Sequence, residues 1–180
     1  EKTKLCVIAS EKSHKNLKIF QHIPQKIKDA LESANLAIEI VGISEDYFKK
    51  VTLNNKILNG IILPGRLSRH DTLFSIISSD LLLIPSYTEG NPKVVWEAVE
   101  LGTFPVISKT LTFHGFHHKN YPFRFNPDNS EEFWEIINNA LLEKDVLDLE
   151  DFFTISSHLN IRNEYNKFYK KILGEYVVVI

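Results

Sequence analysis

Short apolar runs alternate along the chain with longer stretches in which apolar residues recur at helical spacing. The short runs are bounded by glycine, proline and polar residues, as buried strands are. We therefore predict strands at residues 5–9, 37–41, 60–64, 81–84 and 104–108, and a sixth strand at 122–125. Between and after them we predict helices at residues 16–34, 46–51, 68–79, 91–101 and 131–143.

This alternation predicts a doubly wound α/β fold, in which a parallel, Rossmann-like sheet carries helices on both faces. Residues 81–84 are apolar on both sides of the strand, which is typical of a central parallel strand. Ligands of such folds bind outside the carboxyl ends of the strands. The loops of interest are therefore those that follow Ala9, Val41, Pro64, Ile84 and Ile107.

Local signals place several helix ends. Pro24 predicts a break within residues 16–34. Ser68 and Ser130 are suited to cap the helices that follow them. Asn91 is predicted to cap the helix at 91–101, with Pro92 as its first residue.

The chain is predicted to be a single domain over residues 1–180, without internal repeats. Residues 145–180 are expected to form a helical tail, which packs on this domain or on a missing N-terminal domain. An apolar helical face supports this expectation, made by Ile161, Tyr165, Phe168, Tyr169 and Ile172. The chain has no initiator methionine and no secretory signal, and an apolar strand follows almost at once. We therefore expect a domain cut from a longer protein.

Composition narrows the classes of function. The 43% of apolar residues are enough for a core, and the net charge of -2 gives no basic field for nucleic acid. No apolar run approaches the roughly 20 residues of a membrane span, so a cytoplasmic location is expected. The sequence leaves peripheral membrane association open without indicating it. Cys6 is the one cysteine, which excludes an intrachain disulfide and a multi-cysteine metal site.

The segment most informative about chemistry is residues 85–98, at the passage from the fourth strand to the next helix. Gly90 allows a sharp turn into the predicted cap, and the free N–H groups at the start of the helix would attract phosphate. Glu89 and Glu97 flank this helix end. Since their charge opposes that of a phosphate, we expect them to bind hydroxyls, one those of a sugar and the other those of a ribose.

This segment resembles the E-x7-E signature of the retaining "glycosyl transferases group 1" family of GT-B enzymes. Its residues are Pro-Ser-x-x-Glu-Gly-Asn-Pro from position 85, then Glu-Ala at 97–98 and Gly-x-x-Pro-Val-Ile-Ser from position 102. Residues 38–42, 63–67 and 126–129 are also similar to segments of that family. The resemblance covers only the C-terminal, donor-binding half of such an enzyme.

The resemblance implies a role for each matching residue. Glu89 would bind hydroxyls of the donor sugar, and Glu97 would hold the ribose. Lys15 would bind the diphosphate, as the lysine of the family's Lys-Gly pair does; here the pair is Lys15-Asn16. Glu89 and Lys15 are thus the candidate catalytic residues.

Further candidate donor-binding residues come from two loops. The backbone at Gly90, Asn91, Lys93 and Val94 would meet the sugar and the diphosphate. The loop of Gly65, Arg66 and Leu67 would read the nucleobase, mostly through its backbone.

One pair departs from the family pattern. The family usually has Gly-Arg after the first strand, and its arginine binds phosphate, whereas this chain has Ala9-Ser10. Lys12 is near enough in sequence to replace that arginine. The alternative is that Lys12 and Lys15 are ordinary surface lysines.

The function that these residues favour is transfer of a sugar from a nucleotide-diphospho-sugar to an acceptor that the sequence does not identify. Retention of configuration is what the resemblance implies. The chain has no Asp-x-Asp motif for a divalent ion, so we expect no metal and no cofactor. The isolated domain is expected to be inactive, because acceptors of this family bind mainly on the N-terminal domain.

Other functions compete with this one. A nucleotide-sugar epimerase of similar fold and a degenerate, non-catalytic binding module both stay open, and Ser10 favours the second. A glycosidase pair of carboxylates would leave the phosphate-binding helix end unexplained. His114, His117 and His118 are expected to belong to a mobile loop over the donor cleft rather than to a metal site.

Overall fold

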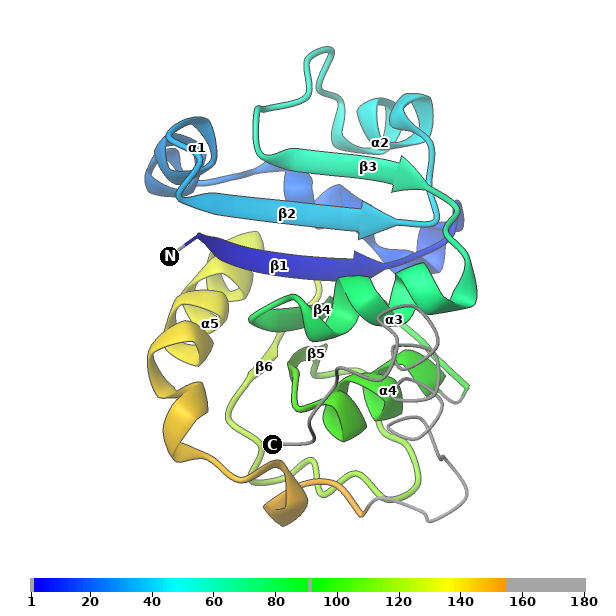
Figure 1. Cartoon of the computed structure of the whole chain (residues 1–180), viewed down its shortest axis with the longest axis vertical. Helices are drawn as coiled ribbons and strands as arrows, with labels where there is room; N and C mark the ends of the chain where they lie inside the picture. The colour runs from blue at the N-terminus through cyan, green and yellow to red at the C-terminus, as the bar shows by residue number, and fades with distance from the viewer. Residues whose placement is uncertain (1, 91, 155–180) are drawn as a thin grey trace, which may run out of the picture.

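The computed structural model describes residues 2–90 and 92–154. Its centre is a six-stranded sheet of order β3-β2-β1-β4-β5-β6, with every neighbouring pair parallel (Figure 1). The strands are β1 Thr3–Ile8, β2 Leu36–Val41, β3 Ile61–Gly65, β4 Leu81–Ile84, β5 Phe104–Ser108 and β6 Arg124–Phe125. The prediction of a doubly wound, Rossmann-like sheet is therefore confirmed.

The strand order reverses between β1 and β4, which are paired through Leu5–Leu81 and Cys6–Leu82. From β1 the chain connects to β2 on one side, and from β4 it connects to β5 on the other side. Because the loops after β1 and β4 therefore run apart, they leave a crevice at the carboxyl edge of the sheet. In Figure 1 this edge lies at the arrowheads of β1, β2 and β3. The fold thus brings the loop after residue 8 beside residues 85–90.

Helices cover both faces of the sheet. They are α1 Gln25–Glu32, α2 Glu45–Thr52, α3 Arg69–Ile77, α4 Lys93–Leu101 and α5 Ser130–Glu143. Four short 3-10 helices are η1 Ser13–Lys15, η2 Leu17–Gln21, η3 Lys144–Val146 and η4 Leu149–Asp151. The α3 and α4 helices contact each other, whereas η2 contacts α2 and α5. Right-handed crossovers place these two groups on opposite faces.

Aromatic side chains pack in the core on both faces of the sheet. Phe20 of η2 packs edge-on against Phe133 and Trp134 of α5, with ring centroids 5.6 and 5.9 Å apart. On the other side, Trp96 of α4 packs edge-on against Phe153, at 6.0 Å. Cys6 of β1 is fully buried between the layers, and burial raises its pKa to about 12. Its thiol is therefore an inert part of the core.

The ends of β1 and β2 are fixed by Gly42, which has a φ of 96°. A Cβ at this position would lie 2.2 Å from the carbonyl oxygen of Ala9. The backbone of Gly42 also donates to Gly65 at 2.7 Å, and Ala9 donates to Val41 at 2.9 Å. Three strand ends are thereby held together where the crevice begins.

Several predicted helix boundaries were wrong. Residues 17–21 form a 3-10 helix rather than the first turns of an α-helix, and α1 begins after Pro24. Asn129 rather than Ser130 caps α5, since its side chain accepts from the amide of Glu132. The predicted cap at Ser68 is confirmed, with its hydroxyl accepting from the amide of Asp71.

The start of α4 also differs from the prediction. The helix begins at Lys93, and Pro92 occupies the N-cap position with a φ of -76° and a ψ of 80° instead of the first helical position. Asn91, the predicted cap, lies outside the described residues.

The predicted helical tail differs over its first residues as well. Residues 145–154 contain parts of η3 and all of η4 rather than an amphipathic α-helix. The apolar face predicted between residues 161 and 172 lies outside the described residues.

The loop between β5 and β6 is packed, contrary to the expected mobile loop. Phe116 is 5% exposed and stacks on Phe153, with ring centroids 4.8 Å apart. The amide of His117 donates to the carbonyl of Phe152 at 2.8 Å. Aromatic side chains near the three histidines therefore anchor this loop to the η4 region.

The loop after β6 gives a prediction about stability and pH. Glu132 accepts hydrogen bonds from the Lys109 ammonium and from the amide of Asn126, and the bond from Lys109 is the main cause of its lowered pKa. A carboxylate with a lowered pKa stabilises the fold above its ordinary pKa of 4.5 and loses that contribution as pH falls through the lowered value. We expect Glu132→Gln to lower the unfolding free energy by about 1 kcal/mol at neutral pH.

This difference between the wild type and Glu132→Gln should shrink steadily below pH 4.5. Urea unfolding of both proteins at neutral and acidic pH measures it. A difference that is constant with pH would contradict the assigned ionic role.

Candidate donor-binding site

A cavity of about 580 Å³ opens at the carboxyl ends of β1, β2 and β3. Four of the predicted substrate-binding residues line it, namely Ser10, Gly65, Arg66 and Leu67. Thr72, in the first turns of α3, also lines it. The sequence-based candidates from the first and third strand ends therefore share one cavity.

The same cavity contains an acid that the sequence reasoning missed. Glu11 accepts two hydrogen bonds from Ser44, from its amide at 2.9 Å and from its hydroxyl at 2.6 Å. These two bonds are the main cause of the lowered pKa of Glu11, and the positive charge of Arg66 contributes further. Since Ser44 is 33 residues away, no local pattern could have revealed the pair.

Ser10 and Glu11 change the character of the site after β1. Lys12, the predicted replacement for a phosphate-binding arginine, is exposed and is not one of the residues that line the cavity. The carboxylate of Glu11 would repel a phosphate there. The cavity is therefore better suited to the hydrogen-bond donors of a nucleoside than to a diphosphate.

Lys15 and Glu89, the predicted catalytic residues, are in direct contact. Lys15 is the last residue of η1, and its Nζ donates to Glu89 Oε1 at 2.5 Å. Their side chains are 20% and 16% exposed. The amide of Tyr87 donates to the carbonyl of His14 at 2.8 Å and so ties the loop after β4 to η1. This backbone link explains why the two charged groups meet.

A second link joins the loops after β4 and β6 to η1. The hydroxyl of Tyr87 donates to Asp128 Oδ1 at 2.7 Å, and the Lys18 ammonium lies 5.3 Å from the centre of the Tyr87 ring. The side-chain amide of Asn16 donates to the carbonyl of Pro127 at 2.8 Å. Three loops that follow three different strands are thus fixed around Lys15.

Glu97 is held by a different cation. It is 6% exposed on α4, and Arg69, the first residue of α3, donates from Nη1 to Glu97 Oε1 at 2.5 Å. Glu89 precedes the first residue of α4 by four positions, and Glu97 is the fifth residue of that helix. Each carboxylate is nevertheless bound by its own basic residue, which the sequence reasoning did not foresee.

The other predicted donor-binding residues that the structure describes lie at the start of α4. Lys93 and Gly90 are exposed, and Val94 is half-buried. Lys93 and Val94 are the first two residues of α4, whose amides have no acceptor one turn earlier in the helix. These amides can therefore donate to an anion at the carboxyl edge.

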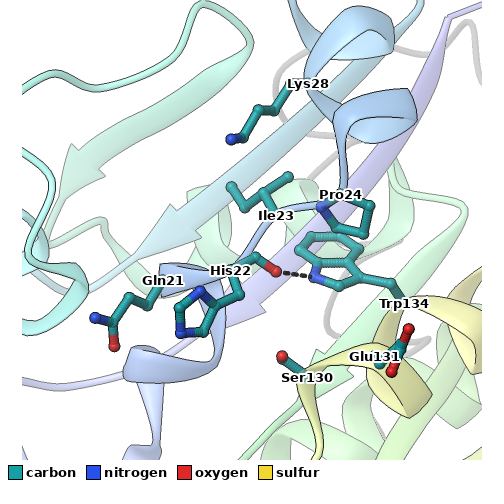
Figure 2. A pocket seen from close by; sticks show the side chains of 8 residues that line it. All are labelled: Gln21, His22, Ile23, Pro24, Lys28, Ser130, Glu131 and Trp134. Carbon is teal, nitrogen blue, oxygen red and sulfur yellow. Dashed lines mark hydrogen bonds between the residues drawn. The ribbon is translucent and has the colours of Figure 1, made fainter.

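Another cavity, of about 430 Å³, lies between η2, α1 and the start of α5 (Figure 2). Trp134 and Lys28 line it, and the indole Nε1 of Trp134 donates to the carbonyl of His22 at 3.0 Å. None of the predicted donor-binding residues lines this cavity.

Two features are absent from the described part of the chain. Residues 2–90 and 92–154 hold no group of three or more His, Cys, Asp or Glu side chains arranged to bind a metal ion. No helix within the same residues combines the length and the apolar character of a membrane span.

The family model for "Glycosyl transferases group 1" matches residues 1–151. The chain belongs to this family. No curated protein sequence matches the chain significantly.

Several solved glycosyltransferases share the fold. The catalytic domain of cholesterol-alpha-glucosyltransferase from Helicobacter pylori superposes with a TM-score of 0.64 at 17% identity, covering 96% of this chain and 99% of that one. The lipopolysaccharide outer core galactosyltransferase WaaB gives 0.63 at 18%, covering 95% of this chain and 50% of that one. A glycosyltransferase from Rickettsia africae gives 0.64 at 17%, covering 97% and 49%. This chain thus spans about half the length of the last two.

Membership in the family gives Asn16 a structural explanation. Asn16 has a φ of 52° and a ψ of 38°, the left-handed conformation that glycine and asparagine tolerate best. The resemblance places a glycine at this position of the group 1 family. Asparagine tolerates the backbone conformation with which the chain leaves η1.

Proposed function

We propose that the chain is the donor-binding domain of a retaining glycosyltransferase that uses a nucleotide-diphospho-sugar. The observation that supports this proposal is the contact between Lys15, which follows β1, and Glu89, which follows β4, where the strand order of the sheet reverses in a group 1 chain. A basic partner neutralises each of the two acids, so the crevice can admit an anionic donor.

Lys15 and the start of α4 assist the departure of the diphosphate. Transfer breaks the bond between the anomeric carbon and a diphosphate oxygen, and negative charge accumulates on the leaving group. A fixed ammonium and fixed amides stabilise this charge without a metal ion. The Lys15 ammonium therefore exchanges its bond to Glu89 for one to the diphosphate.

Glu89, once released by Lys15, accepts hydrogen bonds from hydroxyls of the donor sugar. The exchange keeps the charge of the site balanced, because the diphosphate replaces the carboxylate beside Lys15. The ion pair is thus the resting state of the donor site, and the donor opens it.

The nucleoside occupies the cavity at the ends of β1, β2 and β3. The backbone of Gly65, Arg66 and Leu67 contacts the base there. Glu11 offers a carboxylate to amino or hydroxyl groups of the nucleoside. A free phosphate is disfavoured at the same place.

The acceptor lies outside this domain. The chain spans about half of WaaB and of the Rickettsia africae enzyme, and the proposed partner is an N-terminal domain across the crevice. We accordingly expect donor binding, but no transfer, from residues 1–180 alone, and we place the whole enzyme in the cytoplasm.

A non-catalytic, degenerate glycosyltransferase-like module, which binds a partner rather than a sugar donor, is the second candidate. The observation that favours it is the pair Ser10-Glu11, which puts an acid beside the position where the family has a phosphate-binding arginine. Both candidates predict that the fold is intact, and they differ in whether a nucleotide-diphospho-sugar binds.

Thermal unfolding with UDP, GDP, ADP and their sugars tests the proposal. A ligand that binds only the native state at about 100 times its Kd stabilises it by about 2.7 kcal/mol. For a domain of this size we expect at least one of these ligands to raise Tm by roughly 5–10 °C. No shift with any of them would contradict donor binding and support the non-catalytic module.

A further inference from the structure

The Glu97 carboxylate uses only one of its two oxygens within the described part of the chain. Oε1 accepts from Arg69 at 2.5 Å. Among residues 2–90 and 92–154, Oε2 has no hydrogen-bond partner. The carboxylate is thus held through one oxygen, which leaves the other for a ligand.

Arg69 contacts Glu97, and it stands on the helix that also contributes to the cavity at the ends of β1, β2 and β3. It is the first residue of α3, and Thr72, three positions later, lines the cavity of about 580 Å³. Residues three apart share one face of a helix. Figure 1 shows the chain passing from the end of β3 directly into the first turn of α3. Arg69 therefore connects the wall of the cavity to α4.

The backbone of Arg69 is well fixed. Ser68 caps α3 by accepting from the amide of Asp71 at 3.2 Å, and its own hydroxyl donates to the Asp71 carboxylate at 2.7 Å. The Arg69 side chain is 41% exposed, whereas that of Glu97 is 8% exposed. The cation thus reaches from a capped helix end to a nearly buried acid.

We propose that Arg69 is a positioning residue, which holds the Glu97 carboxylate so that Oε2 can accept a hydrogen bond from a ribose hydroxyl of the donor. This inference rests on the proposed function. A planar guanidinium orients a carboxylate better than a point charge does, and it compensates an acid that is almost withdrawn from water. Without Arg69 the same carboxylate would turn toward solvent or toward another donor.

A purely structural ion pair would affect only the stability of the fold. The test is therefore the ratio of the affinity for a ribonucleotide to the affinity for the same nucleotide without its ribose hydroxyls. Calorimetric titration compares UDP, GDP and ADP with their 2′,3′-dideoxy counterparts, which lack both ribose hydroxyls. A hydrogen bond to a charged group corresponds to about tenfold or more in affinity. The wild type is expected to prefer the ribose form of its best ligand by about this factor.

Arg69→Gln is expected to reduce this preference to about threefold or less, whereas its ratio of diphosphate to nucleoside affinity should match that of the wild type. Adding Glu97→Gln to Arg69→Gln should cause no further loss of the ribose preference. Lys49→Gln is the matched control, because it removes the cation of another ion pair, Lys49–Glu45, and should keep the full preference.

Arg69→Lys keeps the charge without the planar fork, so it should fold and give an intermediate preference even if Arg69→Gln does not fold. A wild-type preference in either Arg69 variant would overturn the positioning role while donor binding stands. A wild type that binds diphosphates without any ribose preference would overturn the roles of both Glu97 and Arg69. If no nucleotide binds at all, the proposed function fails and this inference with it.

Discussion

Lys15→Ala is expected to weaken binding of a nucleoside diphosphate by about ten- to a hundredfold. The expected factor is that of a charge-assisted hydrogen bond between an ammonium and a diphosphate. The Lys15 side chain is 20% exposed and is fixed beside Glu89, so it does not need to be ordered when the donor binds. Affinity for the matching nucleoside, which lacks the diphosphate, should change less than about twofold.

The chain offers a matched control for this variant. Lys28 lines the cavity shown in Figure 2, away from the predicted donor site. Lys28→Ala should leave diphosphate affinity unchanged. Calorimetric titration of both variants with the nucleoside diphosphate and with the nucleoside shows which lysine contributes to diphosphate affinity. If Lys28→Ala loses affinity and Lys15→Ala keeps it, the donor binds in the other cavity.

Gly42→Ala is expected to lower the unfolding free energy by about 3–4 kcal/mol, a severe effect for one methyl group. The residue has a φ of 96°, and a Cβ would meet the carbonyl oxygen of Ala9 at 2.2 Å. Since that oxygen belongs to the backbone where β1 ends, relief requires the strand ends to separate. Tm should fall by roughly 6–16 °C.

Gly102→Ala is the control for backbone strain alone. Gly102 has a φ of 79°, and a Cβ added there would meet no atom of the described residues within 4 Å beyond its own neighbourhood in the chain. Its cost should therefore be only the left-handed penalty of about 1–2 kcal/mol. Calorimetric melting of the two variants compares them. Equal losses of stability would contradict the close contact between β1 and β2.

The order of strands and helices could be predicted because each element carries its own signal. Residues 81–84 are apolar throughout and form the central β4, and the capping hydroxyl of Ser68 begins α3 as predicted. Errors occurred where adjacent residues have equal capping ability, as do Asn129 and Ser130. In such cases tertiary packing decides which residue caps the helix.

The ion pairs of the site could not be predicted, because their partners are distant in sequence. Lys15 and Glu89 are separated by 74 positions, and Arg69 and Glu97 by 28. The family resemblance identified Lys15, Glu89 and Glu97 one by one, and it did not identify Arg69. Only the fold shows that each acid has its own cation, since the strand order determines which loops meet.

The most direct test of the account is a crystal structure of this chain with the nucleotide-diphospho-sugar that raises its Tm most. We predict that the Lys15 ammonium contacts the diphosphate, that its bond to Glu89 is open, and that a ribose hydroxyl lies within hydrogen-bond distance of Glu97. A donor bound elsewhere, with the Lys15–Glu89 pair intact, would contradict the account.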